Sequence, residues 1–170
     1  YKVYRNTTLL TSSTWANNTN IGYGIDGLGA GLWNYTLEYW DGNCTSHLTD
    51  LVWVTVGKAS HALVLLLNGT AGDKTYAANS TANLTATVTP ASFTVQIRHT
   101  NGTVIDSGVG VCKTYQAWPD GSYPVQSYTA GNANYTSASS ATYTATFGEA
   151  AAPGPGGSLP PTPSPPAPPV

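Results

Sequence analysis

The stretch Ala82-Asn-Leu-Thr-Ala-Thr-Val-Thr89 alternates strictly between apolar and polar side chains. Successive side chains of a β-strand point to opposite faces, so Leu84, Ala86 and Val88 would share one face and the Asn and Thr side chains the other. A strand with one apolar and one polar face lies at the surface of a core. The stretch therefore predicts a half-buried strand whose polar face meets solvent.

A second stretch, Trp33-Asn-Tyr-Thr-Leu-Glu-Tyr39, repeats the pattern, and no part of the chain shows a sustained apolar stripe with a 3.6-residue period. We therefore predict an all-β fold, an immunoglobulin-like or jelly-roll-type antiparallel β-sandwich over residues 1–149 with an extended polyproline II tail over residues 150–170. The other candidate strands are Lys2–Tyr4, Leu51–Val56, Ala62–Leu67, Phe93–His99, Thr103–Asp106, Lys113–Ala117 and Thr142–Phe147.

One hairpin can be predicted in detail. A two-residue turn at Asn101-Gly102 would pair Ile97 with Asp106 and mix apolar with polar faces. A three-residue loop over 100–102 pairs Ile97 with Ile105 instead and places Gly102 in the left-handed position. We expect the second register because it keeps the apolar face intact.

Two further segments differ from the simple alternation. Ala62–Leu67 is apolar on both faces, which predicts a central strand covered on both sides or a strand that packs against a neighbouring molecule. The segment Trp15–Gly31 is rich in Asn and Gly and predicts a long loop that carries a glycan at Asn17.

Asn-x-Ser/Thr sequons, none with Pro at the middle position, are the most frequent motif of the chain. A single sequon arises easily by chance, but these fall repeatedly on the predicted outer faces and at turns, where a bulky glycan must lie. We expect most of them to carry N-glycans. The acceptors are Asn6, Asn17, Asn34, Asn43, Asn68, Asn79, Asn83, Asn101 and Asn134.

The chain has unusually few charged side chains. Only 8% of its 170 residues are Asp, Glu, Lys or Arg, and its net charge is −2. This balance predicts no binding to nucleic acid and no attraction to an anionic membrane surface, since both require a basic face. With no run of 18 apolar residues, we expect no membrane insertion. Glycans on Asn, Ser and Thr would instead keep the protein in solution.

Secretion would explain both the sequons and the cysteines. The chain begins at Tyr1 without Met or an apolar leader, so we expect that any secretory signal peptide has been removed. In an oxidising compartment the pair Cys44 and Cys112 predicts one disulfide bond. We therefore expect an extracellular, secreted or cell-surface protein.

The composition changes after Glu149. Residues 150–170 carry no charge and contain nine of the twelve prolines. Such a sequence favours polyproline II, and about 20 residues of it would span roughly 60 Å, enough to lie along the next subunit of an assembly.

The Ser-Pro-Pro, Thr-Pro and Ala-Pro-Pro units of this tail resemble the Pro-rich segments of hydroxyproline-rich glycoproteins of green algae and plants. In those segments proline is hydroxylated and then O-glycosylated. The resemblance covers about 20 residues and implies modification here of Pro160, Pro161, Pro163, Pro165, Pro166, Pro168 and Pro169.

The ionisable residues give little indication of catalysis. Glu38 and Asp41 form the best carboxylate pair, as in glycosidases, but Glu38 shares a predicted outer face with Asn34. His47 and Asp50 could touch, yet no nucleophile is placed beside them, and the histidines show no metal-ligand spacing. We expect no enzyme activity, no metal site and no cofactor. The aromatic residues that could form a sugar-stacking platform are Trp33, Tyr35, Tyr39, Trp40, Trp53 and Trp118.

Three functions fit these features. The first is a structural subunit of an extracellular filament or surface coat, a homopolymer built helically or head-to-tail from copies of this chain. In that assembly one copy would donate either its tail or the strand containing Tyr1, Val3 and Arg5. The second is a monomeric, glycan-shielded cell-surface or viral binding ectodomain. The third is a carbohydrate-binding module.

Overall fold

The computed structural model describes residues 1–16, 18–43 and 46–148 of the chain. This part is all-β, which confirms the predicted fold class, and it contains no helix that could cross a membrane. The strands are β1 (Lys2–Arg5), β2 (Thr8–Ser12), β3 (Gly31–Tyr39), β4 (Leu48–Val56), β5 (Ala62–Leu67), β6 (Lys74–Tyr76), β7 (Ala82–Thr89), β8 (Thr94–His99), β9 (Val104–Val109), β10 (Val111–Gln116), β11 (Gly121–Thr129), β12 (Ala138–Ser139) and β13 (Tyr143–Phe147).

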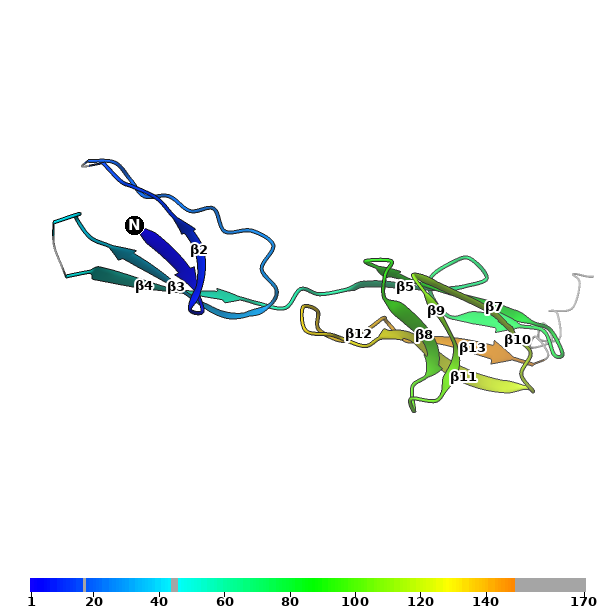
Figure 1. Ribbon diagram of the computed structural model, residues 1–170. Helices are drawn as coiled ribbons and strands as arrows, with labels where there is room; N and C mark the ends of the chain where they lie inside the picture. Colours follow the sequence, from blue (N-terminus) through cyan, green and yellow to red (C-terminus); the bar gives the residue numbers. More distant parts are fainter. Residues whose placement is uncertain (17, 44–45, 149–170) are drawn as a thin grey trace, which may run out of the picture.

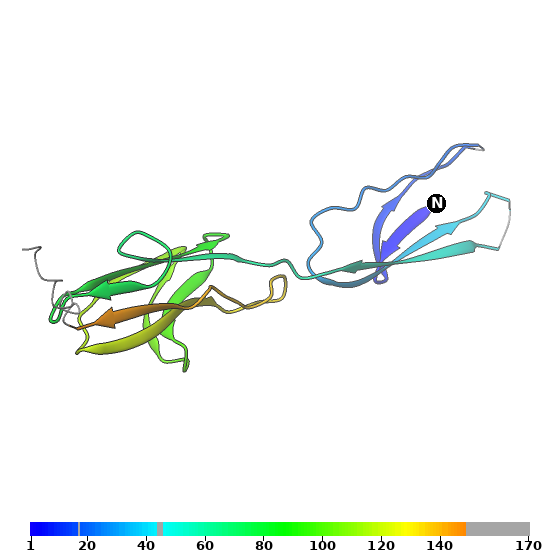
Figure 2. The ribbon, with the colours of Figure 1, turned by 180° about the vertical axis from the view of Figure 1, so that it is seen from behind.

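The strands form two lobes joined by a short extended segment (Figures 1 and 2). The N-terminal lobe is one four-stranded antiparallel sheet with the order β2-β1-β3-β4. The C-terminal lobe holds the sheets β10-β7-β5 and β6-β13-β11-β8-β9, with β12 paired to β11. The structure thus differs from the single sandwich expected over 1–149, because the N-terminal sheet lies apart from the two sheets of the C-terminal lobe (Figures 1 and 2).

The C-terminal lobe is a β-sandwich with a continuous core. Leu84, Ala86 and Val88 of β7 are buried while Thr87 and Thr89 are exposed, as the alternation predicts. These side chains pack with residues from the facing sheet, so the two apolar faces close on one another. The other buried members of the core are Leu65, Leu67, Tyr76, Ala82, Val95, Ile97, Cys112, Val125, Ala145 and Phe147.

The N-terminal sheet has no second sheet against it. Strand β3 turns Trp33, Tyr35, Leu37 and Tyr39 to one face, here called the groove face, and Tyr35 is buried there. The chain between β2 and β3 lies over this face and supplies its cover. That segment was expected to be only a glycan-carrying loop, but part of it serves as an apolar layer.

A few hydrogen bonds hold the junction between the lobes. The backbone N–H of Ala30 donates to Oδ1 of Asn134 at 2.9 Å, and Nζ of Lys58 donates to the carbonyl oxygen of Asn132 at 2.8 Å. Ala59 forms an isolated parallel bridge with Tyr135. The junction is therefore polar and narrow, in contrast to the apolar core of the sandwich.

The β8–β9 hairpin differs from the expected register. Ile97 pairs with Asp106 rather than with Ile105, and a bulge follows at Ile97/Arg98. The bulge absorbs one residue, so Ile105 still packs against the core although it is not opposite Ile97. Gly102 has φ +92°, the left-handed conformation that the sequence predicts.

Strand β5 lies at the edge of its sheet and is not the central strand that its two apolar faces suggested. Its inner face is buried through Leu65 and Leu67, but Val64 on the outer face is 48% exposed. The expectation that this outer face packs against a neighbouring molecule stays a prediction.

Gly110 is required at the corner where the chain passes from β9 to β10, between the two sheets. Its φ is +73°, and a Cβ built there would lie 2.7 Å from the carbonyl oxygen of Ala91. We expect Gly110→Ala to destabilise the sandwich by about 1–2 kcal/mol from the backbone conformation alone, with the clash in addition. Urea unfolding followed by circular dichroism would measure the loss.

Gly57→Ala is the matched control, because no atom lies within 4 Å of its added Cβ and its φ is not in the left-handed region. Equal stability of the two variants would contradict this account of the corner.

Candidate functional site: glycan acceptors and an aromatic groove

The described acceptor asparagines all lie at the surface. Asn6, Asn43, Asn68, Asn79, Asn101 and Asn134 are exposed, and Asn34 and Asn83 are half-buried on the outer faces of their strands. Asn17 lies outside the described residues. The positions are compatible with the predicted glycans, whose attachment stays a prediction.

The hydrogen bonds of several acceptors leave the attachment atom free. Oδ1 of Asn101 accepts the backbone N–H of Thr103 at 2.9 Å, and Oδ1 of Asn68 accepts that of Asn83 at 2.9 Å. A glycan is attached to Nδ2, so the amide can keep its Oδ1 acceptor role after modification. Each such bond would hold the attachment atom in a fixed direction.

Two acceptors of the N-terminal lobe form a reciprocal pair. The backbone N–H of Asn6 donates to Oδ1 of Asn34 at 2.9 Å, and the backbone N–H of Asn34 donates to Oδ1 of Asn6 at 3.0 Å. Asn34 lies opposite Trp53 of β4, and Thr36 lies opposite Leu51. We call this side of the sheet the acceptor face.

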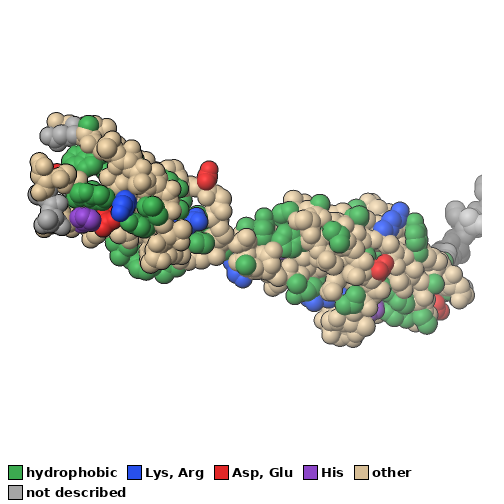
Figure 3. Space-filling model, in the orientation of Figure 1, with side chains coloured by type: hydrophobic (Ala, Val, Ile, Leu, Met, Phe, Trp, Pro, Cys, Tyr) green, Lys and Arg blue, Asp and Glu red, His purple; other side chains and the backbone are tan. Residues whose placement is uncertain are grey.

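The acceptor face also exposes apolar side chains. Trp53 is 57% exposed, Leu51 50% and Leu32 59%. Sugars attached at Asn6 and Asn34 would be placed next to them. Figure 3 shows how few charged side chains accompany the apolar and uncharged polar ones on the visible surface of both lobes.

The predicted Cys44–Cys112 disulfide is not present. Cys112 is a free thiol, 2% exposed, and it faces the interior of the sandwich from β10. Cys44 lies outside the described residues, and its neighbour Asn43 belongs to the turn after β3 in the other lobe. Because Cys112 is enclosed by the core of its own lobe, the pairing that cysteine count suggested is wrong for this structure.

The candidate assembly strand is also placed differently from the expectation. Val3 and Arg5 belong to β1, which pairs with β2 on one side and with β3 on the other. The ammonium group of Tyr1 donates to the carbonyl oxygen of Ser13 at 2.7 Å. Both edges of β1 are thus occupied within one chain, and this strand cannot be donated while the sheet is intact.

Glu38 makes contacts that do not suit a catalytic acid. Its carboxylate accepts the hydroxyl of Tyr4 at 3.1 Å and lies 2.8 Å from Nδ1 of His47, whose ring stacks on Trp40 at 4.4 Å. The hydrogen bond to His47, more than any other contact, holds the pKa of Glu38 below its ordinary value. A glycosidase acid needs a raised pKa, so this environment does not favour the pairing with Asp41.

The six aromatic residues of the predicted platform are not brought together. Trp33, Tyr35 and Tyr39 lie on the groove face, and Trp53 lies on the acceptor face. Trp118 is in the other lobe, where its ring stacks on Tyr123 at 4.8 Å. A single platform made of all six is therefore wrong.

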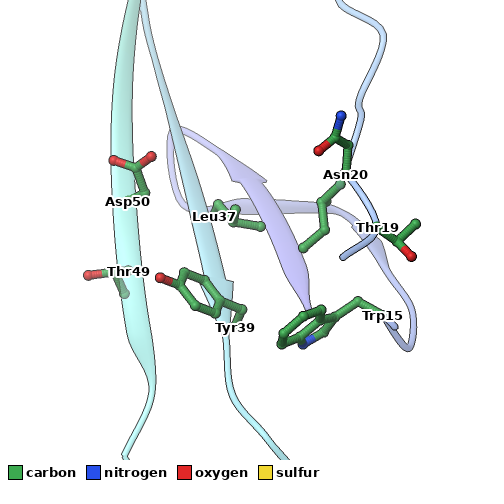
Figure 4. Close-up of a pocket in the computed structure, with 8 residues that line it drawn as sticks. Trp15, Thr19, Asn20, Leu37, Tyr39, Thr49 and Asp50 are labelled. Atoms are coloured by element: carbon green, nitrogen blue, oxygen red, sulfur yellow. The ribbon is translucent and has the colours of Figure 1, made fainter. Parts of the chain in front are cut away.

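An aromatic groove lies instead between the sheet and the covering segment. We define it by Trp15, Ile21, Tyr23 and Ile25 on the segment and by Leu37, Tyr39, Asp50 and Val52 on the sheet. It consists of two adjoining hollows of about 550 and 220 Å³ that share Ile21, Leu37 and Asp50. Figure 4 shows Trp15 reaching from the segment toward Tyr39 and Leu37 of β3, with Asp50 and Thr49 along β4.

Sequence reasoning missed the covering half of this groove. Ile21-Gly-Tyr-Gly-Ile25 alternates apolar residues with glycine, which is the signal that could have revealed an extended apolar layer. Trp15 and Tyr23 are 41% and 43% exposed, so the groove is open to solvent.

The described residues include no group of three His, Cys, Asp or Glu side chains that could hold a metal ion. No protein-family model and no curated protein matches the chain.

Replacing His47 by Ala should raise the pKa of Glu38 toward its ordinary value of 4.5, because it removes the main hydrogen bond to the carboxylate. The lowered pKa means that the contact stabilises the fold above pH 4.5 and that this stabilisation is lost as the pH falls through the folded-state pKa. Carboxyl-carbon NMR titration of both proteins measures the shift. An unchanged titration midpoint for Glu38 would contradict the assignment.

Burial, together with the negative charge of Asp106, raises the pKa of the Cys112 thiol to about 11. In a Cys44→Ser variant at pH 8 we expect alkylation of Cys112 about 100-fold slower than that of an exposed cysteine, since only the thiolate reacts. The rate should rise with pH toward that pKa and should become fast in urea. Rapid stoichiometric labelling of the folded protein at pH 8 would contradict the burial of this thiol.

Proposed function

We propose that this chain is a non-enzymatic structural subunit of an extracellular glycoprotein filament or surface coat, assembled head-to-tail from copies of itself. The observation that carries the proposal is strand β4. It is an edge strand nine residues long, and Leu48 and Val52, which lie on its groove side, are each more than half exposed. A long apolar edge is a liability for a free monomer and is typical of a surface that associates.

The acceptor asparagines support a secreted or cell-surface location. With charge so scarce, N-glycans on the described acceptors and O-glycans on the hydroxylated prolines of the tail would supply the solubility that ionised side chains do not. The sugars would also restrict contact to surfaces without acceptors, and none of the described acceptors lies on the groove face of the N-terminal sheet, while Asn17 of the covering segment lies outside the described residues.

The two lobes favour a head-to-tail contact over a symmetric pair. The N-terminal lobe offers a groove and an apolar edge, while the sandwich is followed by a Pro-rich tail of different chemistry. A contact between unlike surfaces leaves both kinds of surface free at the ends of any open assembly. Repeated without closure, such contacts build a filament.

A carbohydrate-binding module is the second candidate, because the aromatic groove sets Trp15 and Tyr39 beside the polar side chains of Asn20 and Asp50. Stacking of sugar rings on aromatic faces, with a few polar groups for orientation, is a common mode of binding.

Secretion of the full chain from a plant or algal cell that hydroxylates proline would test the proposal. We expect an intact mass well above the 17.7 kDa of the bare chain, with filaments in negative-stain micrographs of concentrated protein. A mass of 17.7 kDa, or a monodisperse monomer at high concentration, would contradict it.

A further inference from the structure

We propose that the aromatic groove of one copy binds the Pro-rich tail of a second copy, with Pro160, Pro163, Pro166 and Pro169 facing the groove. This inference rests on the proposed head-to-tail assembly and names the contact that makes it.

The spacing of the prolines fits one face of a polyproline II helix. Pro160, Pro163, Pro166 and Pro169 follow one another at intervals of three residues. Because polyproline II has three residues per turn and rises about 3.1 Å per residue, these four side chains would form one ridge roughly 28 Å long. The sequence of the tail therefore favours a regular apolar ridge along one side of such a helix.

The groove has the chemistry that binds such a ridge. Aromatic-lined grooves bind Pro-rich segments because the extended helix is already formed and loses little entropy on binding. Trp15 and Tyr39 both line the larger hollow, where the indole of Trp15 points toward β3 and the ring of Tyr39 extends toward Thr49 of β4 (Figure 4). Among the described residues neither the indole N–H of Trp15 nor the hydroxyl of Tyr39 has a hydrogen-bond partner.

The indole N–H of Trp15 and the hydroxyl of Tyr39 would donate hydrogen bonds to backbone carbonyl oxygens of the tail. The carbonyl oxygens of a polyproline II helix make no internal hydrogen bonds, and the prolines contribute no N–H groups that would need acceptors. The tail carries no charge over residues 150–170, so no ionised group would have to be desolvated on the tail side.

Proline also argues against the competing site. The apolar edge of β4 would accept an added strand through backbone N–H groups, but proline has none to give. The tail therefore suits a side-chain groove better than a ladder at the β4 edge.

Access favours the groove face. The described acceptors Asn6 and Asn34 lie on the acceptor face of the same sheet, opposite the groove. Glycans there would exclude protein contacts from the acceptor face, whereas none of the described acceptors lies on the groove face.

The position of the tail favours a second copy over the same copy. Strand β13 runs away from the N-terminal lobe in both views, and the described chain ends at Gly148 beyond it (Figures 1 and 2). To reach its own groove the tail would have to return along the whole sandwich, whereas a copy placed in line would meet it directly.

This arrangement separates the prolines into two groups. With one ridge in the groove, Pro161, Pro165 and Pro168 lie on the other faces of the helix. In assembled protein we expect sugars on these three and bare side chains along the ridge, so only part of the set of prolines that the resemblance implies would be modified.

The test compares two tail variants of the full chain. The ridge variant carries Pro160→Ala, Pro163→Ala and Pro166→Ala. The matched control carries Pro161→Ala, Pro165→Ala and Pro168→Ala. Sedimentation velocity and negative-stain microscopy should show that the first variant loses assembly and that the control retains it. Equal assembly of the two variants would overturn the proposal.

A mixing experiment tests whether the contact joins two copies. A groove variant, Trp15→Ser, keeps an intact tail, and the ridge variant keeps an intact groove. Each should be monomeric alone, and together they should form dimers that do not grow further. Absence of dimers would overturn the proposal, as would a tail bound to its own groove in the monomer.

Direct binding separates this inference from the proposed function. A fluorescent, unmodified peptide of residues 158–169 should bind the ridge variant saturably. It should bind at least tenfold more weakly to a ridge variant that also carries Trp15→Ser. Tyr39→Phe removes only a hydroxyl and should weaken peptide binding less than Trp15→Ser does. This variant still tests the groove if Trp15→Ser folds poorly.

The outcomes are distinct. Filaments from the natural chain without peptide binding would overturn the groove contact and leave the structural role standing. Peptide binding without filaments would support the groove contact and contradict the proposed filament. Binding of cellohexaose in place of the peptide would overturn the contact in favour of a carbohydrate site.

Discussion

A four-stranded sheet must cover at least one of its faces with apolar side chains, and in the N-terminal lobe a single stretch of chain does this. Ile21, Tyr23 and Ile25 lie over Tyr35 and its neighbours where a second sheet would lie in a sandwich. One extended segment is narrower than a sheet, so the cover is incomplete. The groove, the exposed edge of β4 and the division of the sheet into two chemically different faces all follow from this incomplete layer.

The alternation of apolar and polar side chains predicted the strands that have one apolar and one polar face. It failed to predict strands in which a residue such as proline interrupts that alternation. Strands β3 and β7 follow the sequence closely because their inward residues are all apolar. Strand β11 was missed, and Pro124 lies inside it; its ladder with β8 begins one residue later, at Val125, so the absent N–H does not interrupt that pairing.

Long-range pairing could not be predicted from the sequence alone. The period of two residues tells which side chains share a face but not which strand lies beside which, so two lobes were mistaken for one sandwich. The same lack of long-range information explains the wrong disulfide prediction. The number of cysteines suggests that Cys44 pairs with Cys112, but only the fold reveals that Cys112 is enclosed in the core of its lobe. For the site, the acceptor positions were predictable, whereas the groove depends on a segment whose glycines suggested a plain loop.

The two faces of the N-terminal sheet would have opposite roles, with sugar on the acceptor face and protein on the groove face. A cryo-EM reconstruction of the naturally secreted, assembled material tests this most directly. We expect branched density extending from Asn34 and a continuous extended chain lying between Trp15 and Tyr39 of each copy. An empty groove in a well-ordered polymer, or protein packed against the face that carries Asn34, would contradict the account.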